Sequence, residues 1–324
     1  MQTTKNHRYL RLCQVTIISL LSLLFIVSRP YNSASLIDPY TYVELNTGAI
    51  DKFSSKIEYQ EPIIDIIIKS LFFAVGDQYL TYVLFSGLFV FFISSYSLHL
   101  SSNNYIILVF LYIVLNPSLF VLICNLWRQG LACCFLLLLV EVSKNKNKNI
   151  LFQSVAFFLS LLSHFTVAPF LLSVIFCSRV KNLDLKIMVA GLLSSYLTSR
   201  FSSEYIGSFI LTSIDGYKDV GSNEVVRRGI LLCYYILYAA VNKSVYSSDV
   251  LNCGIMVFAA LGVQEDGMFA RLYHYPFVVT CMLLLGSINS RKAICATIAV
   301  GFINILILLN SSTFNHMIQW SNLF

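Results

Sequence analysis

Arginines flank several long apolar runs of the chain, and their type and placement point to phosphate binding. Arg128 opens one such run, while Arg200, the pair Arg227 and Arg228, and Arg271 lie beside others. A guanidinium group presents a planar fork of N–H donors, which matches phosphate oxygens better than the ammonium group of lysine does. Arginines that only bond to the headgroups of ordinary membrane lipids would have the same distribution, so both interpretations stay open.

His164 is a candidate for proton transfer. It lies inside the apolar run from Leu151 to Cys177, where we expect the chain to turn between two short helices near Ser163 and Phe165. A neutral imidazole at such a turn can take a proton from a hydroxyl group or donate a hydrogen bond to a phosphate oxygen. A lone histidine in an apolar hairpin can also serve only to bond the backbone, and this alternative stays open.

Carboxylates alternate with tyrosines in the segment after the first apolar run. Asp38 and Tyr42 belong to this segment, and Glu61 lies near its end. Aromatic faces can stack on sugar rings, while carboxylates can accept protons from sugar hydroxyl groups. These residues therefore suit sugar recognition, although a solvated loop would also be acidic and polar.

The motifs of soluble nucleotide-dependent enzymes are absent from the sequence. It has no Walker loop, no glycine pattern for dinucleotides, no Gly-x-Ser-x-Gly and no Cys/His spacing suited to zinc. We therefore expect no cofactor and no metal, and we expect neither ATP hydrolysis nor chemistry with nucleotide sugars. The energy would come from an activated substrate or from a gradient.

The composition indicates which elements must position these residues. The chain has 324 residues, of which 57% are hydrophobic and 12% are charged, whereas roughly a quarter of the residues in a soluble domain are charged. Apolar runs near the length needed to cross a hydrocarbon core of roughly 30 Å recur along the chain. We therefore predict an all-α fold, a polytopic transmembrane helical bundle that forms a single domain over residues 1–324.

The positions of lysine and arginine predict the topology. Short loops rich in these residues stay in the cytoplasm, which places the N-terminus there and gives about eleven passes. The segment Pro62 to Gly76 fits this order only as an amphipathic helix on the membrane surface. Only Glu141, Asp184 and Asp249, of sixteen acidic residues, then face the cytoplasm. The expected passes are 9–27, 79–98, 105–123, 126–142, two within 151–177, 187–198, 229–242, 250–263, 275–289 and 293–310.

Three periplasmic segments, 28–78, 199–228 and 264–274, would carry the candidate residues. The net charge of +6 lies mostly in the short cytoplasmic loops, so we expect no binding to nucleic acid. The cysteines fall in or beside apolar runs, and we expect them to be packing residues, not disulfide bridges. Small residues after Arg128, among them Gly130 and Ala132, should let a neighbouring helix approach closely.

An ordered set of short motifs resembles the EpsG-type branch of the Wzy polymerases. The motifs are Asp38-Pro39-Tyr40-Thr41-Tyr42 with Glu61-Pro62, Arg128-Gln129-Gly130-Leu131-Ala132, Ser163-His164-Phe165, and Arg271 with Tyr273 and Tyr275. They extend over roughly residues 30 to 280. This family polymerises O-antigen or exopolysaccharide repeat units and is grouped with the GT-C membrane glycosyltransferases.

The resemblance implies a GT-C-like fold in the bacterial inner membrane with a periplasmic active site. A growing glycan would be transferred from undecaprenyl diphosphate to a new repeat unit on the same type of carrier. Other partners would be membrane lipid and a chain-length regulator. Asp38 or His164 would act as base, and Arg128 would stabilise the leaving diphosphate. The residues that would bind the diphosphate or the sugars are Arg128, Gln129, Arg200, Arg227, Arg271, Tyr273, Tyr42 and Glu61.

Two other functions stay open. A flippase for the same lipid-linked repeat units would need charged residues along a path through the bilayer, and flippases often have internal sequence repeats. The sequence has few charged residues within the predicted passes and no visible internal sequence repeat. An O-antigen ligase would use similar chemistry, and the sequence does not separate it from a polymerase.

Overall fold

The described part of the protein is helical, which confirms the all-α prediction. In this computed structural model, no residue of the described part belongs to a strand. The structure describes residues 2–27, 43–44, 62–100, 116, 119, 122–123, 126–144, 150–179, 224–242, 248–263, 269, 272–286, 295, 298–299 and 302–303.

Contacts divide the chain into two compact units. Unit 1 comprises residues 1–131 and 285–324, and unit 2 comprises residues 132–284. The helix α7 (Trp127–Lys144) begins in unit 1 and continues into unit 2. The single membrane domain stays a prediction, and the two units are described in turn.

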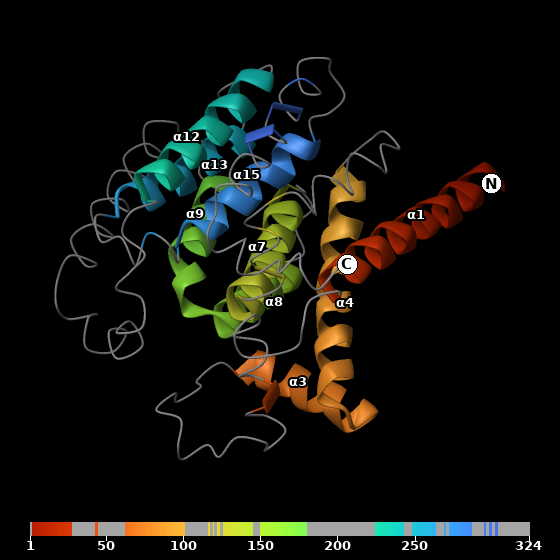
Figure 1. Ribbon diagram of the computed structural model, residues 1–324. Coiled ribbons are helices and arrows are strands. Elements are labelled where there is room, and N and C mark those ends of the chain that lie inside the picture. Colours follow the sequence, from red (N-terminus) through yellow and green to blue (C-terminus); the bar gives the residue numbers. More distant parts are fainter. Residues whose placement is uncertain are drawn as a thin grey trace, which may run out of the picture. The chain divides into compact units, whose positions relative to one another are not determined.

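Two long helices form the frame of unit 1 (Figure 1). They are α1 (Gln2–Val27) and α4 (Gln78–Leu100), and α1 begins several residues before the predicted pass at 9–27. The two helices contact each other at Gly87 of α4, where a Cβ atom would lie 3.4 Å from the side chain of Leu23, an ordinary packing distance. Side chains without bulk at a crossing point let helix axes approach closely.

The helix α3 (Pro62–Val75) lies across the end of α4 (Figure 1), as a separate element in the segment where we predicted an amphipathic helix. Ile64 and Ile68 are buried, whereas Phe73 is 92% exposed. The helix ends at Gly76, whose φ of +67° suits glycine and whose N–H donates to the carbonyl of Phe72 at 2.7 Å. The helix is thus confirmed, while its place on a membrane surface stays a prediction.

Asp77 starts the next helix. Its Oδ1 atom accepts a hydrogen bond from the backbone N–H of Leu80 at 2.7 Å, which satisfies one of the free N–H groups at the start of α4. A glycine terminator followed at once by an acidic cap produces the sharp bend between α3 and α4.

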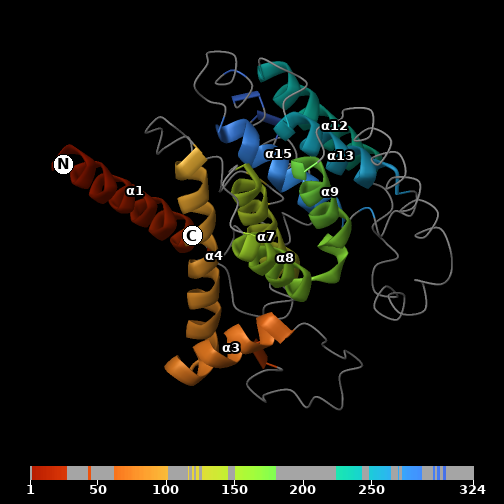
Figure 2. The same cartoon turned by 180° about the vertical axis from the view of Figure 1, so that it is seen from behind.

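Unit 2 is a bundle of helices (Figure 2). Its helix α15 (His274–Gly286) has no polar face, and its apolar residues are buried on all sides, as expected for such a helix. It contacts three neighbours: Tyr275 packs on Phe170, Phe277 packs on Tyr234, and Thr280 bonds to Cys253 at 2.9 Å. The other elements are α8 (Ile150–Ser163), η1 (Phe165–Val167), α9 (Ala168–Arg179), α12 (Glu224–Val241) and α13 (Ser248–Leu261).

The apolar run from Leu151 to Cys177 forms two helices, as predicted. α8 ends at Ser163, and His164 is extended, with φ −166° and ψ 118°. Pro169 explains why the run divides into two helices. A proline has no backbone N–H to donate to the preceding helical turn, so it fits only the first turn of a new helix. The turn lies four to six residues before this proline.

Small residues of α7 permit the expected close approach. The Ser160 hydroxyl of α8 donates to the carbonyl of Ala132 at 2.8 Å, so the two backbones lie near each other. Within the described part of the chain, the free thiols of Cys133, Cys134, Cys253 and Cys281 are buried, as expected for packing residues. Cys13, Cys233 and Cys295 are exposed, so the packing prediction does not hold for them within this structure.

One described helix is both long and apolar enough to cross a membrane: the stretch Gln78–His99 of α4. Shorter apolar helices are Tyr9–Leu24, Ile150–Ser163, Phe165–Phe176, Asp249–Leu261 and His274–Leu285. The predicted pass at 187–198 lies outside the described residues, and so do most residues of the predicted passes at 105–123 and 293–310. The number of passes stays a prediction.

Candidate functional site

Four helix ends meet at one end of unit 2. Thr166, two residues after His164, shares a hydrogen bond of 2.9 Å with Tyr275 at the start of α15. The start of α12 meets the end of α13 through Arg228, whose guanidinium also lies over the ring of Phe269. We call this end of the unit the arginine end. The predicted topology places the same segments on one face of the membrane.

Arg228 holds this end together. Its guanidinium donates to the carbonyl of Leu261 at 2.8 Å and to that of Val263 at 2.7 Å, and it lies 4.1 Å from the ring centroid of Phe269. Carbonyls at a helix C-terminus have no partner within the helix and carry partial negative charge, so a cation is favourable there. Arg228 therefore caps α13 and fastens the segment that follows it.

Arg227 has a different environment, although it is the neighbour of Arg228. We predicted that Arg227 would precede its helix, but α12 begins at Glu224, so both arginines lie within its first two turns. Within the described part of the chain, no hydrogen bond or ion pair engages the Arg227 guanidinium. Its positive charge contributes to the lowered pKa of His274.

His274 is an imidazole kept neutral at the arginine end. It is the last residue of the predicted periplasmic segment 264–274 and the first residue of α15. Burial, and then the positive charge of Arg227, lower the pKa of His274 to about 3. Its Nδ1 atom is buried and makes no hydrogen bond within the described part. Such a group is costly unless something bonds to it.

Aromatic rings line the same end. Tyr273, a predicted binding residue, is buried and lies against Phe269, His274 and Phe277, with ring centroids 5.0 to 5.8 Å apart. This packing fixes the direction of its neighbour His274. Tyr273 is thus part of the wall of the arginine end.

His164 lies at the connection that the sequence predicted. Its backbone N–H donates to Ser160 at 3.1 Å, and its carbonyl accepts from Val167 at 3.2 Å. Its extended backbone takes the side chain out of the regular helix, and the residue is partly exposed. Because Thr166 bonds to Tyr275, His164 belongs to the arginine end together with Arg227 and His274.

Arg128 and Gln129 lie in unit 1, at the start of α7. The preceding residue, Trp127, is fully buried, stacks on Phe85 at 4.1 Å and donates from its indole N–H to Ile123 at 2.8 Å. Arg128 is partly exposed. Gln129 is buried, and its Oε1 atom makes no hydrogen bond within the described part. Sequence reasoning missed Trp127, although a tryptophan directly before an arginine at a helix start is a readable signal for an anchored helix end.

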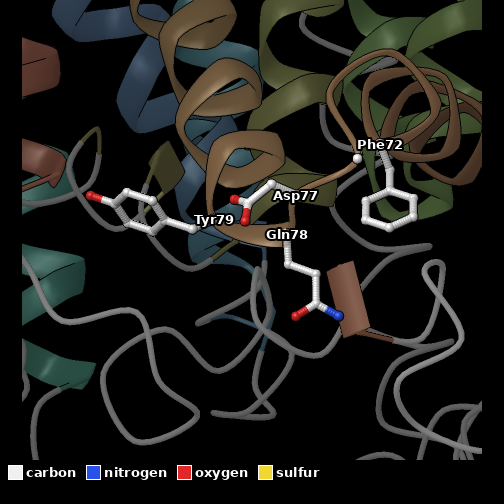
Figure 3. A pocket seen from close by; sticks show the side chains of 5 residues that line it. Phe72, Asp77, Gln78 and Tyr79 are labelled. Carbon is white, nitrogen blue, oxygen red and sulfur yellow. The ribbon is translucent and has the colours of Figure 1, made fainter.

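A second polar group of unit 1 lies at the bend between α3 and α4. The amide of Gln78 donates to the buried carboxylate of Glu44 at 3.2 Å. Burial raises the pKa of Glu44, and the hydrogen bond from Gln78 offsets part of this rise. Next to this pair lies an open hollow of about 330 Å³, in which Phe72 and Tyr79 lie on either side of Asp77 and Gln78 (Figure 3); Gly76 also lines it.

Five predicted site residues lie outside the described residues: Asp38, Tyr42, Glu61, Arg200 and Arg271. Their roles stay predictions.

The arrangement of the arginine end suits anion binding and proton transfer. It combines the cation of Arg227 with the neutral imidazole of His274, whose Nδ1 atom is buried, and with the histidine of the α8–α9 turn. In the described part of the chain, no group of three His, Cys, Asp or Glu residues could hold a metal ion. No protein-family model, no curated protein and no solved structure matches this chain.

Proposed function

We propose that this protein is a membrane glycosyltransferase that polymerises lipid-linked oligosaccharide repeat units at the periplasmic face of the bacterial inner membrane. One observation carries the proposal: the start of α12 with Arg227 and Arg228, the start of α15 with His274 and the turn with His164 lie at the arginine end. Within the described part of the chain, Arg227 makes no hydrogen bond or ion pair, and the buried Nδ1 atom of His274 makes no hydrogen bond. The ordered motifs that resemble EpsG-type Wzy polymerases support the same function.

The proposed reaction joins two lipid-linked glycans. The growing glycan leaves its undecaprenyl diphosphate as the hydroxyl oxygen of the new repeat unit attacks the anomeric carbon. The bond between that carbon and the diphosphate oxygen breaks, and the proton of the hydroxyl passes to a base, either His164 or Asp38. Arginines stabilise the negative charge that develops on the diphosphate, a role that requires no redox step.

The candidate residues fall into two groups, one that would bind the diphosphate and one that would contact the sugars. Arg227 and Arg128, with Arg200 and Arg271, would bind the diphosphate, while Gln129, Tyr42, Glu61 and Tyr273 would bind or border the sugars. The proposal includes a GT-C-like bundle of about eleven passes with a cytoplasmic N-terminus. It also includes a chain-length regulator as a partner.

The decisive experiment is a gel of lipopolysaccharide from a strain that lacks this protein. A polymerase predicts single repeats on lipid A core, and restoration of long chains by the wild type but not by Arg227→Ala present at the same level in the membrane. Normal long chains in the deletion strain would overturn the proposal. Absence of all surface glycan would instead indicate a ligase, and reconstituted protein that moves lipid-linked repeats without forming a glycosidic bond would indicate a flippase.

A further inference from the structure

We propose that one face of α3 binds anionic phospholipid, with Ile66 and Phe73 inserted among the lipid chains and Lys69 bound to a headgroup phosphate. We call this face, formed by Ile66, Lys69, Ser70 and Phe73, the outer face. The predicted topology requires only that α3 does not cross the membrane, whereas the inference names the face, its residues and the lipid. It goes beyond the proposed function, because it depends on α4 as a membrane span and not on glycan synthesis.

Burial separates α3 into two faces. Ile64 and Ile68 lie one turn apart and are fully buried. Ile66 is 63% exposed and Phe73 is 92% exposed, and their spacing of seven residues places them on the opposite side of the helix. A helix that is apolar on opposite sides requires apolar cover on both. The inner face has this cover within the protein, so the outer face needs another apolar partner.

The helix next to α3 identifies this partner as lipid. α4 is both long and apolar enough to cross a membrane, and α3 lies across its end (Figure 1). Leu80, Leu84 and Leu88 are exposed at intervals of about one turn, so an apolar stripe runs along α4 from the bend. Tyr79, in the first turn, is exposed and of a residue type enriched at membrane interfaces. With α4 across the bilayer, α3 therefore lies at the level of the headgroups.

The polar residues of the outer face fit that level. Lys69 is exposed, and within the described part of the chain its ammonium makes no hydrogen bond or ion pair, although Asp65 lies one turn away. A lysine can lay its apolar stem on lipid while its charge reaches a phosphate. The Ser70 hydroxyl donates to the carbonyl of Ile66 at 2.7 Å, so it is satisfied without water. One unengaged cation beside apolar side chains favours an anionic phospholipid such as phosphatidylglycerol.

Tryptophan quenching measures the depth of the outer face in the full chain in nanodiscs. Phe73→Trp is the reporter, and Leu84→Trp on the exposed stripe of α4 is the matched control for a site in lipid. Each signal is compared with that of the wild type, which contains Trp127 and Trp320. Lipid brominated on its chains should quench Phe73→Trp nearly as strongly as Leu84→Trp, and aqueous acrylamide should quench it weakly, because an interfacial helix is immersed by roughly 5 to 10 Å.

A second pair of variants tests whether Phe73 holds the helix in lipid. Ile66→Trp should be quenched by brominated lipid, and it should lose most of this quenching when Phe73→Asp is added. A carboxylate on the outer face favours water over the interface, whereas Phe73→Leu should leave the quenching unchanged. Because Phe73 is almost fully exposed within the protein, both substitutions should leave stability in detergent unchanged.

Lipid composition tests the contact of Lys69. Brominated phosphatidylglycerol, as a minor component in phosphatidylcholine, should quench Phe73→Trp more than the same fraction of brominated phosphatidylcholine does. Lys69→Gln should lower the relative affinity for phosphatidylglycerol about fivefold, the effect of one lysine near an anionic surface. Lys69→Arg keeps the cation and should keep the affinity.

Four results would overturn the inference. Quenching of Phe73→Trp by acrylamide and not by lipid would place the outer face in water, and quenching by neither would mean that another protein segment or a second copy covers it. Equal phosphatidylglycerol affinity in wild type and Lys69→Gln would remove the headgroup contact. Absence of lipid quenching at Leu84→Trp would remove the membrane span itself. None of these measurements involves glycan synthesis, so the inference and the proposed function can fail separately.

Discussion

Replacement of Gly130 by alanine should destabilise unit 1, although alanine is the better helix former. A Cβ atom at this position would lie 2.7 Å from two ring carbons of Phe89 and 3.0 Å from the carbonyl oxygen of Leu122. Carbon atoms normally pack at roughly 3.5 to 4.0 Å. Because Phe89 is itself buried, its ring has little room to withdraw.

The magnitude follows from two opposing terms. Alanine gains about 1 kcal/mol over glycine from helix propensity, while overpacking of a filled core costs about 1 to 3 kcal/mol. The clash involves both a buried ring and a backbone carbonyl, so we place its cost at the upper end. The net effect of Gly130→Ala should be a loss of about 1 to 2 kcal/mol.

A double-mutant cycle makes this prediction specific. Phe89→Leu alone leaves a gap and should cost about 1 kcal/mol or more, but it also makes room for a methyl group at position 130. The double variant should therefore be more stable than the sum of the two single effects by at least about 0.5 kcal/mol. Reversible SDS unfolding in mixed micelles, followed by tryptophan fluorescence, measures all four proteins. Strict additivity, or a Gly130→Ala protein more stable than wild type, would refute the reasoning.

Three further predictions concern the other contacts. Arg228→Ala should lower the free energy of unfolding by about 2 to 4 kcal/mol, because two charged hydrogen bonds and a ring contact disappear. Arg227→Ala should change the free energy of unfolding by less than about 0.5 kcal/mol. Equal losses for the two variants in the same unfolding assay would contradict the different roles of the two arginines. Gly76→Ala should cost about 1 kcal/mol or more, since only glycine adopts a φ of +67° freely, and a stabilised variant would reject the terminator role. Burial raises the pKa of Glu44 above its ordinary 4.5, so protonation of Glu44 favours the folded state. The stability that this group contributes is therefore lost as the pH rises through the folded-state pKa. Glu44→Gln should raise the melting temperature at pH 7 and not at pH 4, and a gain seen only at pH 4 would contradict this reasoning.

The sequence predicted those features that depend on local pattern. The division of the run from Leu151 to Cys177 at His164 followed from its length, which was too great for one pass and short for two. Close packing beside Gly130 followed from the absence of a side chain there. In both cases the physical cause acts over a few residues, so one sequence suffices to find it.

The separate roles of Arg227 and Arg228 could not be predicted in this way. Neighbouring residues on a helix point about 100° apart, so their environments depend on which elements pack against each face. The helix α12 had to start at Glu224, and α13 had to end at Leu261, before Arg228 could reach two carbonyls. Sequence reasoning grouped the two arginines by charge, whereas tertiary contacts distinguish them.

Candidate residues gather at the start of α15 because the rest of this helix is buried and apolar. A helix that is apolar on all sides cannot present chemistry along its length, so only its ends can carry polar groups. Pro276 lies in the first turn of α15, where a residue without an N–H costs no helical hydrogen bond. The ring of Tyr273 contacts His274, and the hydroxyl group of Thr166 bonds to Tyr275. A site formed by the ends of packed helices is held by the core beneath it, which keeps the polar groups in place before a ligand arrives. Substitutions deep in α15, such as Thr280→Val next to Cys253, should therefore reduce pyrophosphate affinity only to the extent that they loosen the arginine end, and hydrogen exchange at Tyr273 and pyrophosphate affinity should change together across such a series.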